Sequence, residues 1–286
     1  MKFDNKAWLT LYDPDYLDNG YLYHFTNIES AIKILNNGTL KFSKLSYAND
    51  TLESKPKIIF LGLENYKDAI ELRKHVVELN TNMLQLLCFT MDYPKRSEDV
   101  SDSIKYGDYS GRGFSLPRMW AQYAENNLGI CLVFKRKAIS QLIKNTLGSS
   151  LIYEDKIEYK NQFQEVEIDS SISKNLLEVI KLHKSLVAKS LSSLDFFKNN
   201  KELVKYCYFS KLDDWRSENE YRFLAFGDED YLIKDIDSAL SGVIIGEKMS
   251  PENQRIISFF CENICEVKQI TFTCNGCNLI NIRSEE

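Results

Sequence analysis

The sequence has little of what marks membrane proteins, secreted proteins and nucleic-acid-binding tails. No stretch of the 286 residues approaches the roughly 18 uninterrupted apolar residues of a membrane span. The first residues, Met1 to Asn5, lack the apolar core of a signal peptide. Lysine and arginine are scattered, with no run of five. We therefore expect a soluble, cytoplasmic protein that has no membrane partner.

Bulk charge and cysteine usage narrow the class of protein further. The net charge is −5 and the pI is about 5.5, which argues against binding nucleic acid through a basic total, although a local basic groove stays open. Seven cysteines, an odd number, favour reduced thiols. The stretch Gly111-Arg112-Gly113 lacks the third glycine and the preceding strand of a dinucleotide-binding fingerprint.

The order of the predicted elements indicates an α+β fold. Hydrophobic residues make up 44% of the chain and charged residues 27%, which is typical of a folded globular protein. Strands separated by helices of unequal length are too irregular for a doubly wound parallel sheet. We expect one domain over residues 1–286, with a mixed or split antiparallel sheet, peripheral helices and a helical insert near residues 170–208.

Local signals place several of these elements. A short strand ends near Phe25, and Thr26 with Glu29 fits a capping box at the start of a helix that Gly38 ends. The apolar segment 83–91 predicts a central strand. Residues 116–126 have a helical pattern, and the Gly-free, Pro-free stretch 170–199 predicts one long helix or two.

The first segment with suggestive polar chemistry surrounds His24. This residue lies at the end of a predicted strand, just before a helix N-terminus, where an imidazole could meet a polar ligand beside free backbone N–H groups. The alternative is a histidine that packs and bonds locally. Both interpretations stay open at this point.

The second segment runs from Arg118 to Asn126. Trp120 and Tyr123 are three residues apart and share a helix face, so both rings could be core. In the functional interpretation one of them stacks on a flat heteroaromatic ligand. Arg118, near the helix start, could then pair with a phosphate or carboxylate.

The third segment, residues 213–223, is dense in charge and precedes an apolar strand. If the strand begins near Glu218, then Glu218, Glu220 and Arg222 point to one face. This set could be an ion pair on a solvated face, which contributes little energy. It could equally be a carboxylate that bonds a ribose hydroxyl or stabilises an oxocarbenium-like transition state.

Four C-terminal cysteines raise the question of a metal. Cys261, Cys265, Cys274 and Cys277 could supply four thiolates to zinc. The gap between the two pairs is short for a zinc ribbon, and the Asn-Gly between the last two cysteines predicts a hairpin turn. Buried free thiols are therefore the favoured interpretation, and we expect no metal site.

Taken in order, several short pieces resemble an uncharacterised bacterial family, the domain of unknown function 2971, over roughly residues 20–275. Each piece alone is weak, but their order and spacing are fairly specific. The pieces are residues 22–25, 40–43 with Asn49, Asp50 and Glu53, 88–90, 119–124, 129–134, Trp215 with 218–222, and 242–246.

A looser resemblance is to ADP-ribosyltransferases of the His-Tyr-Glu type, which implies an ADP-ribosyltransferase-like fold with NAD as a substrate. Such enzymes place a Tyr-His pair on an early strand, which corresponds here to Tyr23 and His24. The resemblance implies that His24 binds a ribose of NAD and that Tyr123 stacks on nicotinamide. It also implies that Glu220, or Glu218, holds the nicotinamide ribose and promotes bond breaking. The sequence departs from that pattern in lacking a clear Tyr motif.

The leading hypothesis is therefore an NAD-dependent ADP-ribosyltransferase-like enzyme, a bacterial toxin or phage-defence factor acting on a protein or nucleic-acid acceptor. A second hypothesis is a non-enzymatic module that binds a nucleotide or nucleic acid, and a third is a structural or interaction protein. Geometry separates them, because the enzyme needs its polar residues in one cleft. The candidate residues are His24, Glu218 and Glu220 for catalysis, and Tyr23, His24, Asn49, Asp50, Arg118, Trp120, Tyr123 and Arg222 for cofactor binding.

Overall fold

The computed structural model describes residues 20–93, 109, 111–148, 152–182 and 200–282. Within these ranges the main sheet has nine strands, in the order β15-β14-β13-β6-β1-β5-β11-β7, and β3 pairs with β5 beside this path. Neighbours are antiparallel except β13 and β14, which are parallel, so the mixed sheet of an α+β fold is confirmed. The strands are β1 (Tyr21–Thr26), β3 (Ser43–Lys44), β5 (Leu84–Met91), β6 (Ile130–Lys135), β7 (Ile152–Lys156), β11 (Glu220–Phe226), β13 (Leu240–Ile245), β14 (Glu266–Thr273) and β15 (Gly276–Asn281).

Three two-stranded sheets lie beside the main sheet in the described part of the chain. They are β10 (Ser210–Leu212) with β8 (Glu158–Lys160), β4 (Ile58–Phe60) with β9 (Val166–Ile168), and β12 (Leu232–Ile233) with β2 (Leu40–Lys41).

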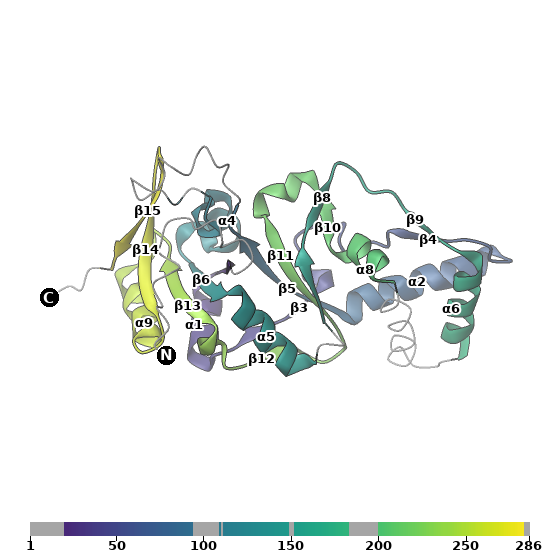
Figure 1. The fold of residues 1–286 in the computed structure, drawn as a ribbon, viewed down its shortest axis with the longest axis horizontal. Helices are drawn as coiled ribbons and strands as arrows, with labels where there is room; N and C mark the ends of the chain where they lie inside the picture. Colours follow the sequence, from purple (N-terminus) through teal and green to yellow (C-terminus); the bar gives the residue numbers. More distant parts are fainter. Residues whose placement is uncertain (1–19, 94–108, 110, 149–151, 183–199, 283–286) are drawn as a thin grey trace.

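Helices flank the sheet along the whole molecule. One end carries β14, β15 and α9, and the other carries α2, α6, β4 and β9 (Figure 1). The helices are α1 (Ile28–Asn37), α2 (Tyr66–Asn82), α4 (Pro117–Tyr123), α5 (Arg136–Leu147), α6 (Ser170–Leu182), α8 (Lys201–Tyr208) and α9 (Pro251–Cys261). Short 3₁₀ turns are η3 (Leu45–Tyr47), η4 (Gly113–Ser115), η5 (Glu125–Asn127), η7 (Asp213–Glu218) and η8 (Ile236–Ser238).

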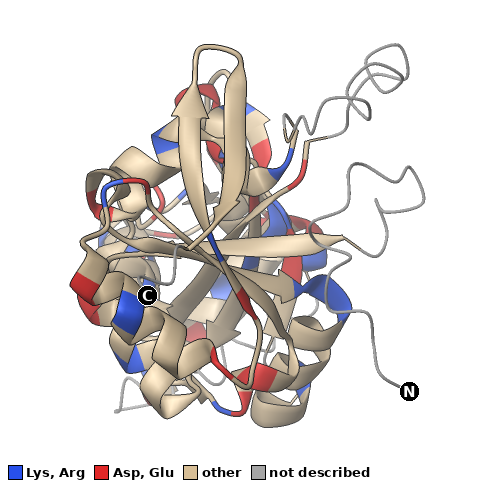
Figure 2. Cartoon of the chain, turned by 90° about the vertical axis from the view of Figure 1, so that its left-hand side faces the viewer, with Lys and Arg blue, Asp and Glu red and all other residues tan. Residues whose placement is uncertain are grey.

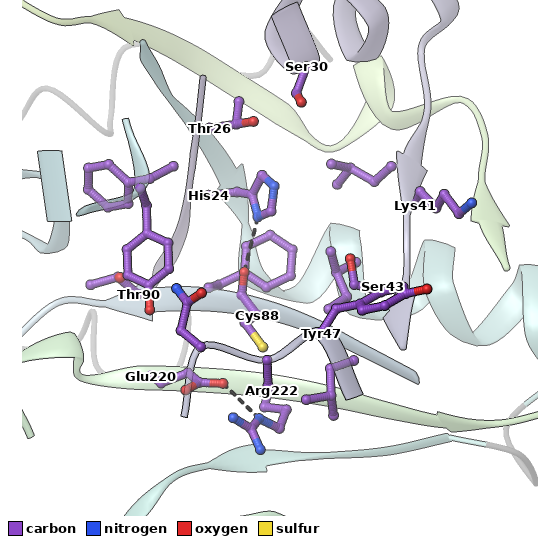
Figure 3. Close-up of a pocket in the computed structure, with 18 of the residues that line it drawn as sticks. His24, Thr26, Ser30, Lys41, Ser43, Tyr47, Cys88, Thr90, Glu220 and Arg222 are labelled. Atoms are coloured by element: carbon purple, nitrogen blue, oxygen red, sulfur yellow. Dashed lines mark hydrogen bonds and ion pairs between the residues drawn. The ribbon is translucent and has the colours of Figure 1, made fainter. Parts of the chain in front are cut away.

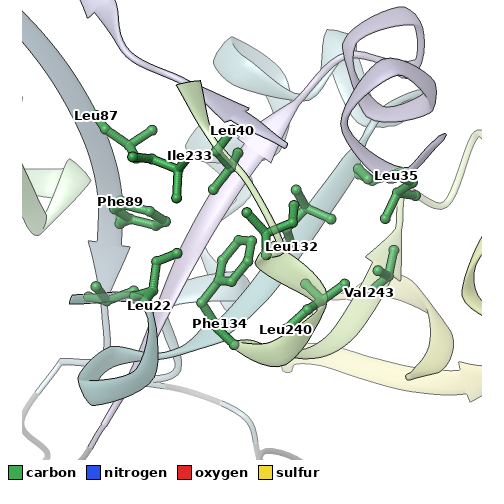
Figure 4. Close-up of a cluster of buried hydrophobic side chains, with 14 of the residues drawn as sticks. Leu22, Leu35, Leu40, Leu87, Phe89, Leu132, Phe134, Ile233, Leu240 and Val243 are labelled. Carbon is green, nitrogen blue, oxygen red and sulfur yellow. The ribbon is translucent and has the colours of Figure 1, made fainter. Parts of the chain in front are cut away.

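Both faces of the sheet are covered by apolar clusters. Figure 4 shows the larger one, in which Leu22 and Phe134 from the sheet meet Leu35 from α1 and Leu40 from β2. The opposite face packs on α4, where Trp120 is fully buried. Strands β1 and β6 lie between these two clusters, and the second face of β5 packs in a third cluster through Leu84 and Leu86. Because these strands are covered on both sides, their sequences are almost continuously apolar, as the segment 83–91 predicts for a central strand.

The start of α1 differs by one residue from the prediction. Thr26 still pairs with Ile130 in the β1–β6 ladder, so it cannot cap the helix. Asn27 is the cap instead, and its side chain accepts a hydrogen bond from the Ser30 N–H at 2.8 Å. Gly38 ends the helix in the left-handed region, with φ +60°, as expected.

Two further boundaries differ from those that the sequence suggests. The helix expected over residues 116–126 ends at Tyr123, because Glu125, Asn126 and Asn127 all have positive φ. The strand that could begin near Glu218 begins instead at Glu220, after the 3₁₀ turn η7 and a left-handed Asn219. In the predicted insert, α6 and α8 are present, and the expected helix over 183–199 lies outside the described residues.

The sheet opens between β1 and β5. These strands pair only at Leu22 with Met91 and at Tyr23 with Thr90, whereas β1 pairs with β6 at six positions and β5 with β11 at seven. Beyond Tyr23 the two halves of the sheet separate. This opening positions the site described next.

No helix among the described residues is long and apolar enough to cross a membrane. All seven cysteines are free thiols. Lysine and arginine lie interspersed with aspartate and glutamate over the described elements (Figure 2).

Candidate functional site

A cavity of about 570 Å³ lies where β1 and β5 separate. Ligand pockets of small molecules and cofactors typically measure about 300–1,000 Å³. Figure 3 shows His24 and Thr26 on one side of it, Cys88, Thr90, Glu220 and Arg222 on the other, and Lys41, Ser43 and Tyr47 along a third. The polar and charged residues that line it are Tyr23, His24, Thr26, Ser30, Lys33, Asn37, Thr39, Lys41, Ser43, Lys44, Tyr47, Asn49, Glu53, Thr90, Tyr123, Lys211, Glu218, Glu220 and Arg222.

Where β1 and β5 no longer pair through their backbones, the His24 side chain of β1 contacts the backbone of β5. Its Nδ1 lies 3.0 Å from the Cys88 carbonyl oxygen. Because a carbonyl can only accept, Nδ1 carries the proton and the neutral ring keeps Nε2 as an acceptor. Burial lowers the pKa of His24, which favours this neutral form. The imidazole therefore offers an acceptor nitrogen at the wall of the cavity.

Glu220 forms the centre of a buried ion cluster. Arg222 Nε donates to its Oε1 at 2.7 Å, and the Lys211 ammonium lies 2.6 Å from its Oε2. The contact with Lys211 is an ion pair, and because a carboxylate oxygen has more than one lone pair, Oε2 can still accept a hydrogen bond. The Arg222 guanidinium continues to Glu53 at 2.5 Å. All four side chains are at least nine-tenths buried.

The charges in this cluster keep Glu220 ionised. Burial alone would raise the pKa of its carboxyl, but the positive charges of Arg222 and Lys211 outweigh burial and lower that pKa to about 2. Burial alone would lower the pKa of Lys211, but the carboxylates of Glu220, Glu53 and Glu218 raise it. Three carboxylates, including Glu218, face two cations, so this end of the cavity carries an excess of negative charge.

Glu218 and Tyr123 form the adjoining wall. The Tyr123 hydroxyl donates to Glu218 Oε1 at 2.5 Å, and Lys211 donates to Oε2 at 2.8 Å. Burial and the neighbouring Glu218 carboxylate raise the pKa of Tyr123, so its hydroxyl stays protonated. Both oxygens of Glu218 therefore have partners, and the ring of Tyr123 lines the cavity.

The structure brings most of the candidate residues from the sequence together. His24, Tyr123, Glu218, Glu220 and Arg222 line one cavity, with Asn49 beside them. The sequence allowed a solvated ion pair in the third segment, and this was wrong, because Arg222 and Glu220 are 1% and 3% exposed. The roles of these residues in chemistry stay predictions.

Other candidates lie elsewhere or serve packing. Trp120 is core: its ring packs perpendicular to that of Phe25, and its indole N–H donates to the Phe114 carbonyl at 2.7 Å. Tyr23 touches the cavity but packs its ring against Phe114. The remaining two do not line the cavity: Arg118 donates to Asp214 and Ser217 on the surface, and Asp50 accepts from the Leu52 N–H.

Sequence reasoning missed Lys211 and gave Glu53 no role. Lys211 lies on a three-residue strand, and no spacing relates it to the glutamates that it meets. Glu53 precedes Arg222 by 169 residues. The one available signal is the polar loop of residues 44–57, which holds both Asn49 and Glu53.

The four C-terminal cysteines do not converge. Cys261 packs in the cluster under α9 and Cys277 in the cluster on the opposite face of the sheet, while Cys274 is exposed. Among the described residues, no group of three or more His, Cys, Asp or Glu side chains could hold a metal ion.

Comparison with known proteins gives one family and two solved structures. The family model described as protein of unknown function (DUF2971) matches residues 119–223, a range that contains Tyr123, Lys211, Glu218, Glu220 and Arg222. No curated protein matches the sequence.

Both solved structures are of DarT from Thermus sp. 2.9, one in complex with carba-NAD+ and one with ADP-ribosylated single-stranded DNA. For the first, the TM-score is 0.33 and the identity 12%, over 88% of this chain and 96% of that one. For the second, the TM-score is 0.34 and the identity 12%, over 88% and 94%.

Proposed function

We propose that this protein is an ADP-ribosyltransferase-like enzyme that uses NAD as its substrate. The observation that carries the proposal is Glu220, a carboxylate held ionised by Arg222 and Lys211 at the wall of a cavity large enough for a nucleotide. A fixed negative charge in a water-poor site stabilises positive charge as it develops in a transition state.

The chemistry is the cleavage of the bond between nicotinamide N1 and the ribose anomeric carbon of NAD. The bonding electron pair leaves with nicotinamide, and the ribose acquires oxocarbenium character. Glu220 accepts a hydrogen bond from a hydroxyl of this ribose and stabilises the cationic sugar. An acceptor nucleophile then bonds to the anomeric carbon and loses its proton to solvent, so ADP-ribose is transferred.

The other residues of the cavity have roles that suit this reaction. Nε2 of His24 accepts from a ribose hydroxyl, and the Tyr123 ring stacks on nicotinamide, oriented by its hydroxyl bond to Glu218. The excess negative charge beside them favours binding of the cationic nicotinamide ring of NAD. The lysines at the other end, Lys33, Lys41 and Lys44, suit the phosphates.

The test is release of nicotinamide from NAD, followed by chromatography, together with transfer of label from NAD to cell extract. Glu220→Gln should lower the rate by about 10²–10³-fold, because it removes the charge that stabilises the transition state. Glu262 is an exposed residue just after α9, so Glu262→Gln is the matched control and should keep the parent rate. Glu220→Asp keeps the charge but shortens its reach, and should also lose activity.

The outcomes discriminate between the hypotheses. Nicotinamide release that is equal in the parent and in folded Glu220→Gln and Glu220→Asp would contradict the proposal. NAD binding without release at any pH would leave a nucleotide-binding module in its place.

We propose further that the acceptor is a cellular protein or nucleic acid and that the enzyme is a cytoplasmic toxin or defence factor. Modification of a host macromolecule would arrest the cell that makes it. Expression of the parent should therefore stop growth, and expression of Glu220→Gln should not. Equal toxicity of the two chains, at equal expression, would contradict this role.

A further inference from the structure

The ammonium group of Lys211 is shared among three carboxylates at the wall of the cavity. It lies 2.6 Å from Glu220 Oε2, 2.8 Å from Glu218 Oε2 and 3.6 Å from Glu53 Oε1. Lys211 comes from β10, which pairs with β8 and lies outside the main sheet that carries Glu220. A cation from one element therefore holds carboxylates from three other segments, the loop before β4, η7 and β11.

The position of this ammonium is itself fixed by its surroundings. Lys211 is 5% exposed, and its Nζ lies 5.2 Å from the centre of the Trp215 ring. Glu218, its second partner, is held in turn by the Tyr123 hydroxyl. A continuous chain of polar contacts thus runs from Tyr123 through Glu218 and Lys211 to Glu220.

The two carboxylate oxygens of Glu220 are contacted by cations from two different strands. Arg222, two residues along the same strand, holds Oε1, and Lys211 holds Oε2. The terminal torsion of a glutamate is broad and roughly two-fold, so one contact alone leaves the carboxylate free to turn. Two cations on the two oxygens fix its plane.

We propose that Lys211 is a positioning residue for Glu220, which sets the plane of the carboxylate and keeps it charged. The proposal rests on the function proposed above, in which Glu220 acts on the ribose. Lys211 does not itself touch the reacting atoms. Burying a lysine costs desolvation that an apolar side chain would avoid, so stability alone does not account for it.

Charged and titratable groups face Glu220 from every element packed against it. Arg222 on β11, Lys211 on β10, Cys88 on β5 and Tyr159 on β8 act on Glu220 directly. Glu218 on η7 and Glu53 before β4 contact Lys211. Arg222 and Lys211 are the positive members of this set. Loss of Lys211 leaves three carboxylates around one guanidinium, so the charged form of Glu220 becomes less favoured.

The experiment compares Lys211→Met with the parent in the full chain. Glu220 is titrated by NMR after ¹³C labelling of glutamate carboxyls, with its signal assigned by comparison with Glu220→Gln. The titration midpoint should rise by about 1–3 pH units in Lys211→Met. This readout needs no enzymatic activity, so it tests the positioning role separately from the proposed function.

The pH profile of nicotinamide release gives a second readout. A depressed carboxyl pKa means that activity is present above the midpoint and is lost as the pH falls through it. In Lys211→Met this loss should move up from about pH 2 into the range of about pH 3–5, while kcat falls by about 10²-fold and KM changes much less. Lys211→Arg keeps the charge, so it should keep the parent midpoint and recover part of kcat.

Two variants separate this role from a general loss of ion pairs. Glu218→Gln breaks a buried contact of Lys211 but leaves the cation on Glu220, so the midpoint of Glu220 should not rise. Lys205→Met removes a lysine that pairs with Asp155 and Glu158 outside the cavity, and should keep the parent profile. The proposal is overturned by an unchanged Glu220 midpoint in folded Lys211→Met, or by an equal rise in Glu218→Gln. If the midpoint rises but the parent releases no nicotinamide, the positioning role stands and the proposed function fails.

Discussion

Two buried lysines, Lys57 and Lys211, have different hydrogen-bond and ion-pair partners. Lys211 faces carboxylates, and these raise its pKa. Lys57 donates to two carbonyl oxygens, those of Cys207 at 2.9 Å and Ser210 at 3.2 Å. Carbonyl dipoles compensate a buried charge less than a carboxylate does, and burial lowers the pKa of Lys57 to about 8.

This difference predicts a pH-dependent contribution of Lys57 to stability. Its pKa is lower in the folded chain than the roughly 10.4 of an unfolded lysine, so the folded state disfavours the charged form. Unfolding therefore takes up a proton between about pH 8 and 10.4, and the stabilisation grows as the pH rises through this window.

The measurement is urea denaturation of the parent and Lys57→Met at several pH values from 7 to 10. The free energy of unfolding of the parent, minus that of Lys57→Met, should rise above pH 8 by up to about 1.4 kcal/mol per pH unit. Lys205→Met, which removes a half-exposed lysine, serves as the control and should give a flat difference over the same range. A flat difference for Lys57→Met as well would show that Lys57 is charged in the folded protein.

At the scale of elements, the turn after α4 supports the end of β1. Glu125, Asn126 and Asn127 have positive φ, which reverses the chain so that Gly129 N–H can donate to the Ala124 carbonyl at 2.9 Å. A Cβ on Gly129 would lie 2.2 Å from the Thr26 carbonyl oxygen. The atoms of Thr26 and Ala124 that this Cβ would meet are all backbone atoms, so no side chain can move to make room.

Gly129→Ala should therefore destabilise the protein by about 1–3 kcal/mol through overpacking. It should also weaken ligand binding at the cavity, since Thr26 lines it. Gly148→Ala is the matched comparison, because a Cβ there meets nothing within 4 Å and the cost is limited to its φ of +80°, about 1–2 kcal/mol. Urea denaturation and ligand-induced thermal shift measure the two effects. A Gly129→Ala variant with parent stability and parent ligand shift would contradict the close packing of this turn on β1.

At the scale of the whole molecule, the opening between β1 and β5 divides the main sheet into two parts that meet at the cavity. One part carries His24, and the other carries Glu220. A ligand that contacts both sides binds only the folded arrangement, so it should stabilise the entire chain. This expectation can be tested without turnover by using carba-NAD+, an NAD analogue.

At 100 times its Kd, carba-NAD+ should raise the free energy of unfolding by about 2.7 kcal/mol, which is seen as a higher Tm. His24→Ala should reduce the shift, because it removes an acceptor at the wall of the cavity. Glu262→Gln should keep it. The absence of any shift with the parent, at millimolar analogue, would contradict nucleotide binding in this cavity.

Elements with a strong local pattern could be predicted, and boundaries set by long-range contacts could not. The apolar run 83–91 and the strand before α1 follow from side-chain periodicity, which acts within a few residues. The sequence predicts Thr26 as the cap of the helix, yet pairing with Ile130, about a hundred residues away, keeps it in the strand. Trp120 and Tyr123 share a predicted face, but only their packing sends one ring to the core and the other to the cavity.

The sequence by itself determined that this chain forms an α+β fold with a mixed sheet, and it drew attention to His24 and to the pair Glu218 and Glu220. Hydrophobic periodicity and the order of polar segments are local properties, so they can be read directly from the chain. Only the tertiary structure decided that Glu53 and Lys211 join Glu220 and Arg222 in one cluster, because charges from distant segments leave no periodic signal. It also decided that this set is buried, and burial is what turns a common surface pair into a fixed, ionised carboxylate.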